Sequence, residues 1–383
     1  MMSPVSRKEY VQAIVERYRQ AGRQEKRRIL DEFCRICGYH RKHAIRKLSH
    51  ARKPCRRHRK PGRPSRYRKP EIMAVLQGIW QAAHYPCSKR LKAILDIWIE
   101  PYEQTFGVLP AWVKQALDAI SAATIDRLLT QERLRVKRKG LSTTKPGTLL
   151  KRHIPIKTNQ WDEARPGFLE ADTVAHCDAS MAGQFVFSLD ITDIATGWTE
   201  QRALWGKGER GVLEQIISIE ASLPFSILGF DCDNGGEFLQ WHLIRYFQNR
   251  PKPVQFTRSR PYQKNDNAHI EQKNWTHVRQ WLGYQRFEKP ALVEQLNELY
   301  TSEWRLFHNF FLPSAKLQSK ERRRSKIIKV HDNPKTPYQR ILDSKHIPQR
   351  TKDKLTDHYQ TLNPFQLRKA IDQKINKIKQ LAR

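Results

Sequence analysis

Three short segments between Phe168 and Asn274 constrain this chain more than any other feature, because each carries a carboxylate where a structural segment rarely has one. They are residues 169–173 (LEADT), 233–238 (DNGGEF) and 267–274 (NAHIEQKN). The first is mostly apolar or β-compatible, which predicts a strand with Asp172 at its middle. Asp is depleted in strands and is costly to bury without a partner. Asp172 is therefore a candidate for chemistry.

The segments around Asp172 predict a mixed α/β domain. Alternation of side chains predicts a strand over residues 185–192, and residues 199–205 can form a third strand. Apolar residues at helical spacing from Val212 predict a helix that ends before Pro224. The apolar run 225–232 then predicts a buried strand.

Asp233 follows that run directly, so it is expected at the carboxyl end of a strand, where open α/β sheets place their ligands. Residues 236–249 predict another helix and residues 254–257 a short edge strand. The expected fold is a mixed five-stranded sheet with helices.

Glu271 lies in the helix predicted to start near Asn267. Its position belongs to the same helical stripe as Ala268, Trp275 and Val278, which is expected to face inward. A buried Glu must be paired, protonated or bound to a cation. We therefore expect Glu271 to be buried and functional.

Inward carboxylates on two strands and one helix would form an oxygen-rich cage. Hard cations such as Mg²⁺ or Mn²⁺ prefer these ligands. Two such ions, about 3.5–4 Å apart, activate a nucleophile and stabilise the leaving oxygen in phosphoryl transfer. The expected cofactor is two Mg²⁺ or Mn²⁺ ions per active site.

Together, Asp172, Asp233 in DNGGEF and Glu271 in NAHIEQKN resemble the DDE catalytic core of retroviral-integrase-type transposases. Asp233 and Glu271 are 38 positions apart (271 − 233), close to the usual spacing in that family. The resemblance implies a ribonuclease-H-like fold with these three residues as catalytic residues and metal ligands. It also implies cleavage of a transposon end by water, then strand transfer by the freed 3′-hydroxyl without a covalent protein–DNA intermediate.

Neighbouring polar residues leave alternatives at this site. Asp231 lies on the same predicted strand face as Asp233, although the family motif favours Asp233. Asp190 and Asp193 are predicted to be hairpin and turn residues. The residues expected to contact substrate phosphate beside the site are Lys264, Asn265 and Lys273.

The net charge of the chain indicates the class of its binding partner. The 383 residues include 71 Lys and Arg against 38 Asp and Glu, a net charge of +33, and the natural partner of such a chain is polyphosphate. A membrane surface is the other possibility, but no apolar run approaches the ~20 residues needed to span a bilayer, and the amino terminus has no signal-peptide core. With cysteines that suggest no disulfide framework, we expect a cytoplasmic protein, and the resemblance to insertion-sequence transposases implies a bacterial, nucleoid-associated one.

The amino-terminal region is predicted to bind DNA. Residues 1–50 show three amphipathic helices with a basic last helix, typical of a helix-turn-helix, although a plain three-helix bundle is the alternative. A zinc site in CRICGYHRKH, residues 34–43, is disfavoured by its spacing. Residues 51–69 are predicted to form a basic Pro/Arg linker in which PGRP resembles the core of an AT-hook. The alternative is nonspecific contact of this linker with the DNA backbone. The expected contacts here are Arg41, Lys42, Arg46 and Arg63.

Residues 70–130 predict a second helix-turn-helix-like domain. Ser121 is expected to cap its recognition helix, which would present Thr124 and Arg127 to DNA. The remaining segments are predicted to be a basic linker at 131–160, the integrase-type core at 161–312 and a basic, mainly helical region at 313–383. Its last helix is striped with isoleucine, which suits packing on its own subunit or an oligomer contact.

The leading interpretation is a transposase of a bacterial insertion sequence that binds terminal inverted repeats and target DNA as a dimer or tetramer. One alternative is a catalytically silent DNA-binding protein derived from a transposase, which the intact carboxylates disfavour. The other alternative is a metal-dependent nuclease without strand transfer, which a joined product would distinguish.

Overall fold

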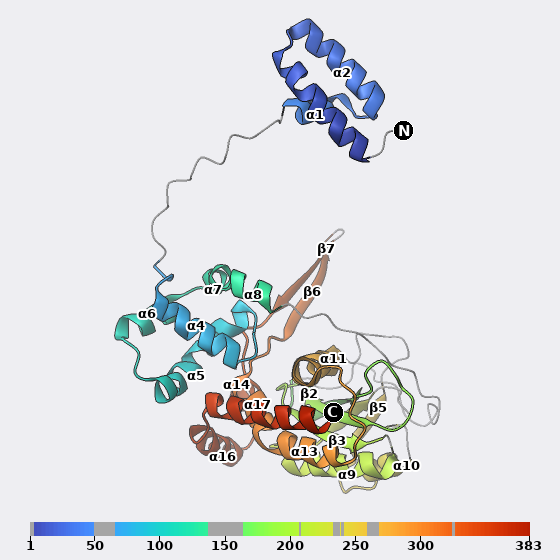
Figure 1. Cartoon of the computed structure of the whole chain (residues 1–383). Helices are drawn as coiled ribbons and strands as arrows, with labels where there is room; N and C mark the ends of the chain where they lie inside the picture. The colour runs from blue at the N-terminus through green and yellow to red at the C-terminus, as the bar shows by residue number, and fades with distance from the viewer. Residues whose placement is uncertain are drawn as a thin grey trace. The chain divides into compact units, whose positions relative to one another are not determined.

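The computed structural model describes residues 4–49, 66–136, 164–206, 208–232, 238, 241–258, 268–323 and 326–383 (Figure 1). The chain divides into two compact units, Met1–Arg66 and Tyr67–Arg383. Four of the predicted site residues lie outside the described residues: Arg63, Asp233, Lys264 and Asn265.

The first unit contains the three predicted helices, α1 (Pro4–Gln20), α2 (Arg23–Cys37) and α3 (Arg41–Ser49). Their apolar faces meet around Phe33, which is fully buried. Helix α2 ends because Gly38 adopts a left-handed conformation, φ 68°, and its N–H donates to the carbonyl of Cys34. That turn separates α2 from the basic helix α3.

The second unit begins with five helices. Ser121 accepts a hydrogen bond from the backbone N–H of Thr124, so the predicted cap is confirmed. Trp98 and other buried residues of these helices share one hydrophobic core with the C-terminal helices, while the domain boundaries at 70 and 130 stay predictions. The helices are α4 (Pro70–Ala82), α5 (Ser88–Phe106), α6 (Ala111–Ala119), α7 (Ala122–Leu128) and α8 (Thr130–Arg135).

A mixed five-stranded sheet follows, with the order β3-β2-β1-β4-β5. β1 pairs antiparallel with β2, and β2 antiparallel with β3, whereas β1 is parallel to β4 and β4 to β5. This order and these directions define a ribonuclease-H-like, integrase-type fold, as predicted. The strands are β1 (Phe168–Ala175), β2 (Val186–Asp193), β3 (Thr199–Trp205), β4 (Gly229–Cys232) and β5 (Gln255–Arg258).

The two faces of the sheet differ in polarity. One face is apolar, with Leu169, Ala171 and Leu189 packed in the core that includes α9 (Glu209–Ser222) and α10 (Trp241–Gln248). Since side chains alternate along a strand, the residues between them point to the other face. That face carries Glu170, Asp172, Ser188, Asp190, Thr192, Thr199 and Gln201.

Helices from the second half of the chain cover this polar face. Asn274 bonds to Asp172, Tyr300 to Ser188 and Asn309 to the backbone of Thr199. The covering elements are α11 (Ala268–Lys273), the π-helix η1 (Asn274–Arg279), α12 (Gln280–Leu282), α13 (Ala291–Leu299), the π-helix η2 (Tyr300–Trp304) and α14 (Arg305–Phe311).

The C-terminal region is mainly helical, as predicted, but it also contains a β-hairpin that the sequence did not predict. Strands β6 (Leu317–Arg323) and β7 (Lys326–His331) pair antiparallel. Helices α15 (Pro337–Asp343), α16 (Gln349–Gln360) and α17 (Pro364–Leu381) follow. The isoleucine stripe of α17 is buried in the chain's own core, so packing on its own subunit is the confirmed alternative.

Within the described residues, no helix has the length and apolar character needed to cross a membrane.

Candidate active site

Asp172 lies at the middle of β1, on the polar face of the sheet, and is half-buried. Its Oδ1 accepts a hydrogen bond from the backbone N–H of Thr173 at 2.7 Å. Its Oδ2 accepts one from Nδ2 of Asn274 at 2.6 Å. Because Asn274 is three residues after Glu271, this bond joins the strand carboxylate to the helix that carries the predicted third carboxylate.

A second contact fixes the same helix at its start. The backbone N–H of Ile270 donates to Oε2 of Glu170, two residues before Asp172 on β1. Two hydrogen bonds therefore hold α11 and the start of η1 against one strand, on the face where Asp172 lies.

Glu271 is exposed, and the prediction that it is buried was wrong. The buried positions of this helix are Ile270, Lys273, His277, Val278 and Trp281. The predicted stripe assumed a regular helix, whereas the chain becomes π-helical from Asn274 to Arg279, which changes the side-chain period. An exposed carboxylate beside the polar face is open to a cation or a substrate.

Asp233, the remaining predicted carboxylate, follows the last described residue of β4 in the sequence. Cys232, the last residue of β4, is paired in register with Ala171, next to Asp172. Asp231, the competitor of Asp233, is fully buried and accepts a hydrogen bond from Oγ1 of Thr257 on β5 at 2.6 Å. This bond gives Asp231 a structural role, and Asp233 stays the prediction for the site.

Two opposite charges are buried beneath the site. Asp190 pairs in register with Asp172 on the neighbouring strand and accepts a hydrogen bond from Nε2 of Gln201 at 2.8 Å. Burial raises the pKa of Asp190 to about 7, against the attraction of Lys273. Burial lowers the pKa of Lys273 to about 7, against the attraction of Asp190.

The contacts of Lys273, Asp190 and Asp193 test three predictions. Lys273 donates to the carbonyl of Gly197 at 3.1 Å and its ammonium group lies 3.3 Å from Nε2 of His277, so its burial contradicts a contact with DNA phosphate. Asp190 lies buried on β2, which pairs antiparallel with β3, so its prediction as a hairpin residue is confirmed. Asp193 is the turn residue that was predicted, because it accepts hydrogen bonds from Gly167 and Thr196.

The described residues contain no group of three or more His, Cys, Asp or Glu side chains that could hold a metal ion. Two of the three predicted ligands, Asp172 and Glu271, are described: Asp172 lies on the polar face of the sheet, and Glu271 is exposed on the helix that the Asn274–Asp172 hydrogen bond joins to it. Hard divalent cations take carboxylate oxygens as donors. This part of the donor set therefore fits Mg²⁺ or Mn²⁺.

Apart from Lys273, the predicted DNA contacts that are described lie on α3 and α7. Arg41, Lys42 and Arg46 are exposed on α3 of the first unit. Arg127 is exposed on α7 and donates to Oγ1 of Thr124 at 3.2 Å. Their cationic groups are accessible to phosphate.

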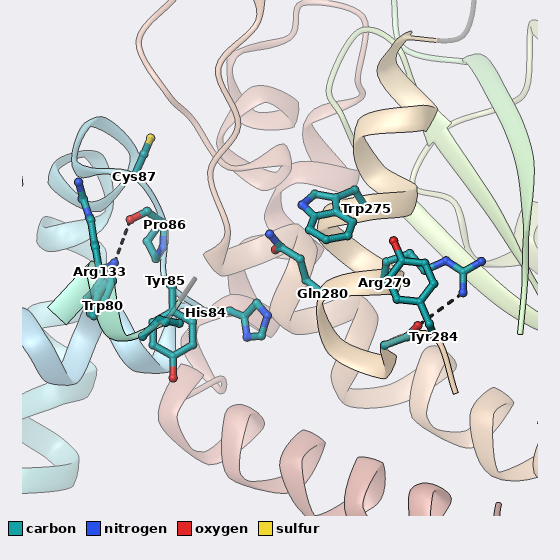
Figure 2. A pocket seen from close by; sticks show the side chains of 12 residues that line it. Trp80, His84, Tyr85, Pro86, Cys87, Arg133, Trp275, Arg279, Gln280 and Tyr284 are labelled. Atoms are coloured by element: carbon teal, nitrogen blue, oxygen red, sulfur yellow. Dashed lines mark hydrogen bonds between the residues drawn. The ribbon is translucent and has the colours of Figure 1, made fainter. Parts of the chain in front are cut away.

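A cavity that the sequence did not predict lies beside η1 and has a volume of about 460 Å³ (Figure 2). We call it the aromatic pocket, because Trp80, Tyr85, Trp275 and Tyr284 line it. These residues come from segments roughly two hundred positions apart, so no local pattern relates them. The only sequence signal is the aromatic content itself.

The strand order and register place the second unit in the class of ribonuclease-H-like, integrase-type folds. No family model matches the chain. The chain is 37% identical over 345 residues to the uncharacterized protein y4rM of Sinorhizobium fredii, covering 88% of this chain and 96% of that protein. The chain therefore belongs to the same family as y4rM.

Solved structures similar to the chain include two of integrases. The catalytic core domain of BIV integrase matches at 13% identity with a TM-score of 0.29, covering 47% of this chain and 96% of that one. A simian T-cell lymphotropic virus intasome in complex with PP2A regulatory subunit B56 gamma matches at 12% identity with a TM-score of 0.33. The match covers 64% of this chain and 74% of that chain. The fold assignment rests on the sheet itself rather than on these values.

Proposed function

We propose that this protein is a DDE transposase that cleaves DNA at the ends of a bacterial insertion sequence and joins them to target DNA. The observation that carries the proposal is the hydrogen bond between Asp172 and Asn274. It joins the strand carboxylate at the middle of the sheet to the helix of Glu271. In the sequence, Asp233 directly follows β4, the strand that pairs in parallel with the strand of Asp172. We propose Asp233 as the remaining member of the catalytic triad.

The three carboxylates would hold two Mg²⁺ or Mn²⁺ ions, which supply Lewis acidity to the attacking and leaving oxygens of phosphoryl transfer. The chain's own part is positional. Asn274 orients the carboxylate of Asp172 through its amide, and Glu170 holds the first turn of α11 through Ile270. The buried residues below keep water away from the inner side of the site.

DNA recognition is proposed for two surfaces. The basic helix α3 would bind the terminal repeats through Arg41, Lys42 and Arg46, and α7 would contact DNA through Thr124 and Arg127. Arg63, Lys264 and Asn265 are proposed as further contacts. Since two element ends must be joined, we propose that the active form is a dimer or tetramer.

A strand-transfer assay tests the proposal. A pre-cleaved element end, taken from the DNA that flanks the gene, is incubated with a supercoiled target and Mg²⁺. We expect joined product with the wild-type chain and none with Glu271→Gln. Glu294→Gln is the matched control, because Glu294 is an exposed carboxylate on α13, outside the proposed site.

The other outcomes identify the alternatives. Cleavage without joining, lost in Glu271→Gln, would identify a nuclease. Binding of the element end without cleavage or joining at any divalent metal would identify a DNA-binding protein without this chemistry. Full activity of Glu271→Gln would remove Glu271 from the site.

A further inference from the structure

We propose that the aromatic pocket holds one unstacked nucleobase of the DNA substrate beside the catalytic centre. The inference rests on the proposed function, because it names how the substrate of that site is gripped.

The walls of the pocket are aromatic rings from two sides (Figure 2). Trp275 is half-buried on η1, four residues after Glu271. Tyr85 is 38% exposed on the opposite side, and its ring meets the buried ring of Trp80 edge-on at 5.0 Å. Aromatic faces of this kind stack on any base, because every base has a π-face.

Two arginines complete the lining. Arg279 lies 4.8 Å from the ring centroid of Tyr284 and donates to the carbonyl of Ala175, the last residue of β1. Arg133 forms an ion pair with Asp126, yet its buried Nη2 has no hydrogen-bond partner among the described residues. A buried donor without an acceptor is costly, and the carbonyl or ring nitrogen of a base would satisfy it.

The loop that closes the pocket is strained. His84 and Tyr85 have φ of 60° and 62°, a left-handed conformation that non-glycine residues rarely adopt. The ring of His84 stacks on Trp281 at 3.9 Å, and the N–H of Tyr85 donates to the carbonyl of Trp80. Such strain persists where surrounding contacts impose it, and it is common at ligand clamps. Here it presents Tyr85 to the cavity.

The pocket lies in a series of cavities that share lining residues and end at a cationic groove. A second cavity of about 360 Å³ also contains His84, Tyr85 and Gln280, and it adjoins a groove of about 1140 Å³ through Arg90 and Gln272. Gln272 is next to Glu271 in the chain. The cations of the groove are Lys89, Arg90, Lys92, Lys329 and Lys335. A basic groove beside stacking rings is the arrangement by which proteins bind single-stranded DNA.

Binding of an oligonucleotide to the full chain in EDTA tests this inference without catalysis. The probe is an end-labelled thymidine strand of about 12 nucleotides with a central 2-aminopurine, whose emission falls when it stacks. We expect Trp275→Ala and Tyr85→Ala each to weaken binding roughly tenfold and to restore the emission, since one stacked base contributes about that much. Trp275→Phe should retain most of the affinity.

Trp112→Ala is the matched control, because Trp112 is 39% exposed on α6 and outside the pocket. Wild-type affinity and unchanged quenching in both Trp275→Ala and Tyr85→Ala would overturn the inference. Thermal unfolding separates a folding defect from a lost contact, with Trp275→Phe as the folded reference. If these two variants lose stability yet keep the affinity, the pocket is a packing site and the inference is wrong.

The strand-transfer assay distinguishes the two proposals. If the wild type joins DNA and Trp275→Ala binds the oligonucleotide normally, the base-binding proposal for the pocket is wrong and the transposase proposal is supported. If the wild type does not join DNA but Trp275→Ala binds the oligonucleotide more weakly, the transposase proposal is wrong and the pocket is supported as a base-binding site.

Discussion

Asp190 and Lys273 are charged side chains buried under the site, and each depends on the other. Because the pKa of each group is about 7, Asp190 can bind a proton and lose its charge when its partner is removed. We therefore expect Lys273→Met to lower the free energy of unfolding by about 1–3 kcal/mol, the cost of a buried polar group that loses its partner, in urea titrations at pH 7.

The double variant Asp190→Asn/Lys273→Met is the control for this prediction. It removes both charges and should recover most of the lost stability. A double variant as unstable as Lys273→Met would mean that the ammonium group is needed for its bonds to Gly197 and His277 rather than for its charge.

Two buried histidines predict a dependence of stability on pH. Burial lowers the pKa of His176 and of His308 to about 3, below the ordinary value of 6.5. Their contribution to stability is complete above pH 6.5 and is lost as the pH falls toward 3, because unfolding lets both rings bind protons. Each contributes at most about 1.4 kcal/mol per pH unit.

Urea unfolding of the second unit at pH 7, 6, 5 and 4 checks this expectation. His308→Gln should reduce the slope of stability against pH between 6 and 4, because one titrating group is removed. A slope identical to that of the wild type would contradict a neutral, buried His308.

At the scale of elements, the β6–β7 hairpin combines strand pairing with a high density of positive charge. Lys329 lies in the groove described above, together with Val330 and His331. Five cations between residues 320 and 329 belong to these two strands: Lys320, Arg322, Arg323, Lys326 and Lys329.

Replacing these five residues with glutamine should weaken DNA binding and flatten its salt dependence. The logarithmic slope should fall by about 0.9 for each phosphate contact that is lost. Affinity measured by fluorescence anisotropy between low and moderate salt gives the slope. Glutamine at the exposed Lys354, Lys369 and Lys377 of α16 and α17 is the control, and an equal effect for each charge removed would mean that only net charge matters.

Elements with a clear period were predictable from the sequence, whereas the β6–β7 hairpin was not. The three helices of the first unit match the structure because their apolar residues recur at helical spacing and meet in one core. The strand 199–205 also matches, although it is buried along almost its whole length and shows no alternation. The hairpin was missed, because the basic residues Lys320, Arg322, Arg323, Lys326 and Lys329 interrupt both strands and leave no clear alternation of apolar and polar side chains. Pairing with a neighbouring strand of the same chain stabilises these strands without such a pattern.

The candidate site was only partly predictable from the sequence, because some of its features depend on contacts that no local pattern indicates. Asp172 stands out because a carboxylate interrupts an apolar strand, and the hydrogen bond to Asn274 agrees with its importance. The exposure of Glu271 was not predictable, because it depends on a π-helix that no local pattern indicates. The aromatic pocket depends on contacts between distant segments, which a single sequence does not contain.

At the scale of the whole molecule, the two compact units have separate cores. The first unit is short, so its stability is expected to be marginal. Phe33 is fully buried at its centre. A Phe→Ala change in a core costs about 3–5 kcal/mol, which should be enough to unfold this unit alone.

Calorimetry of Phe33→Ala checks the separation. We expect the transition of the first unit to disappear and that of the second unit to keep its midpoint. Binding of the element ends should weaken, because α3 is lost as a helix. A downward shift of the second transition would show that the two units are thermodynamically coupled.

The π-helix η1 separates α11 from α12, and the side chains of the two segments point in different directions around the helix axis. A π turn contains one residue more than an α turn, so the side chains after it are rotated relative to those before it. Glu271 precedes η1, whereas Arg279, Gln280 and Tyr284 lie at its end or beyond it. Relatives that lost one residue here would keep the acidic residue in place but turn the rest of the helix by about 100°. An insertion or deletion at this turn would therefore redirect the residues that line the aromatic pocket without moving Glu271.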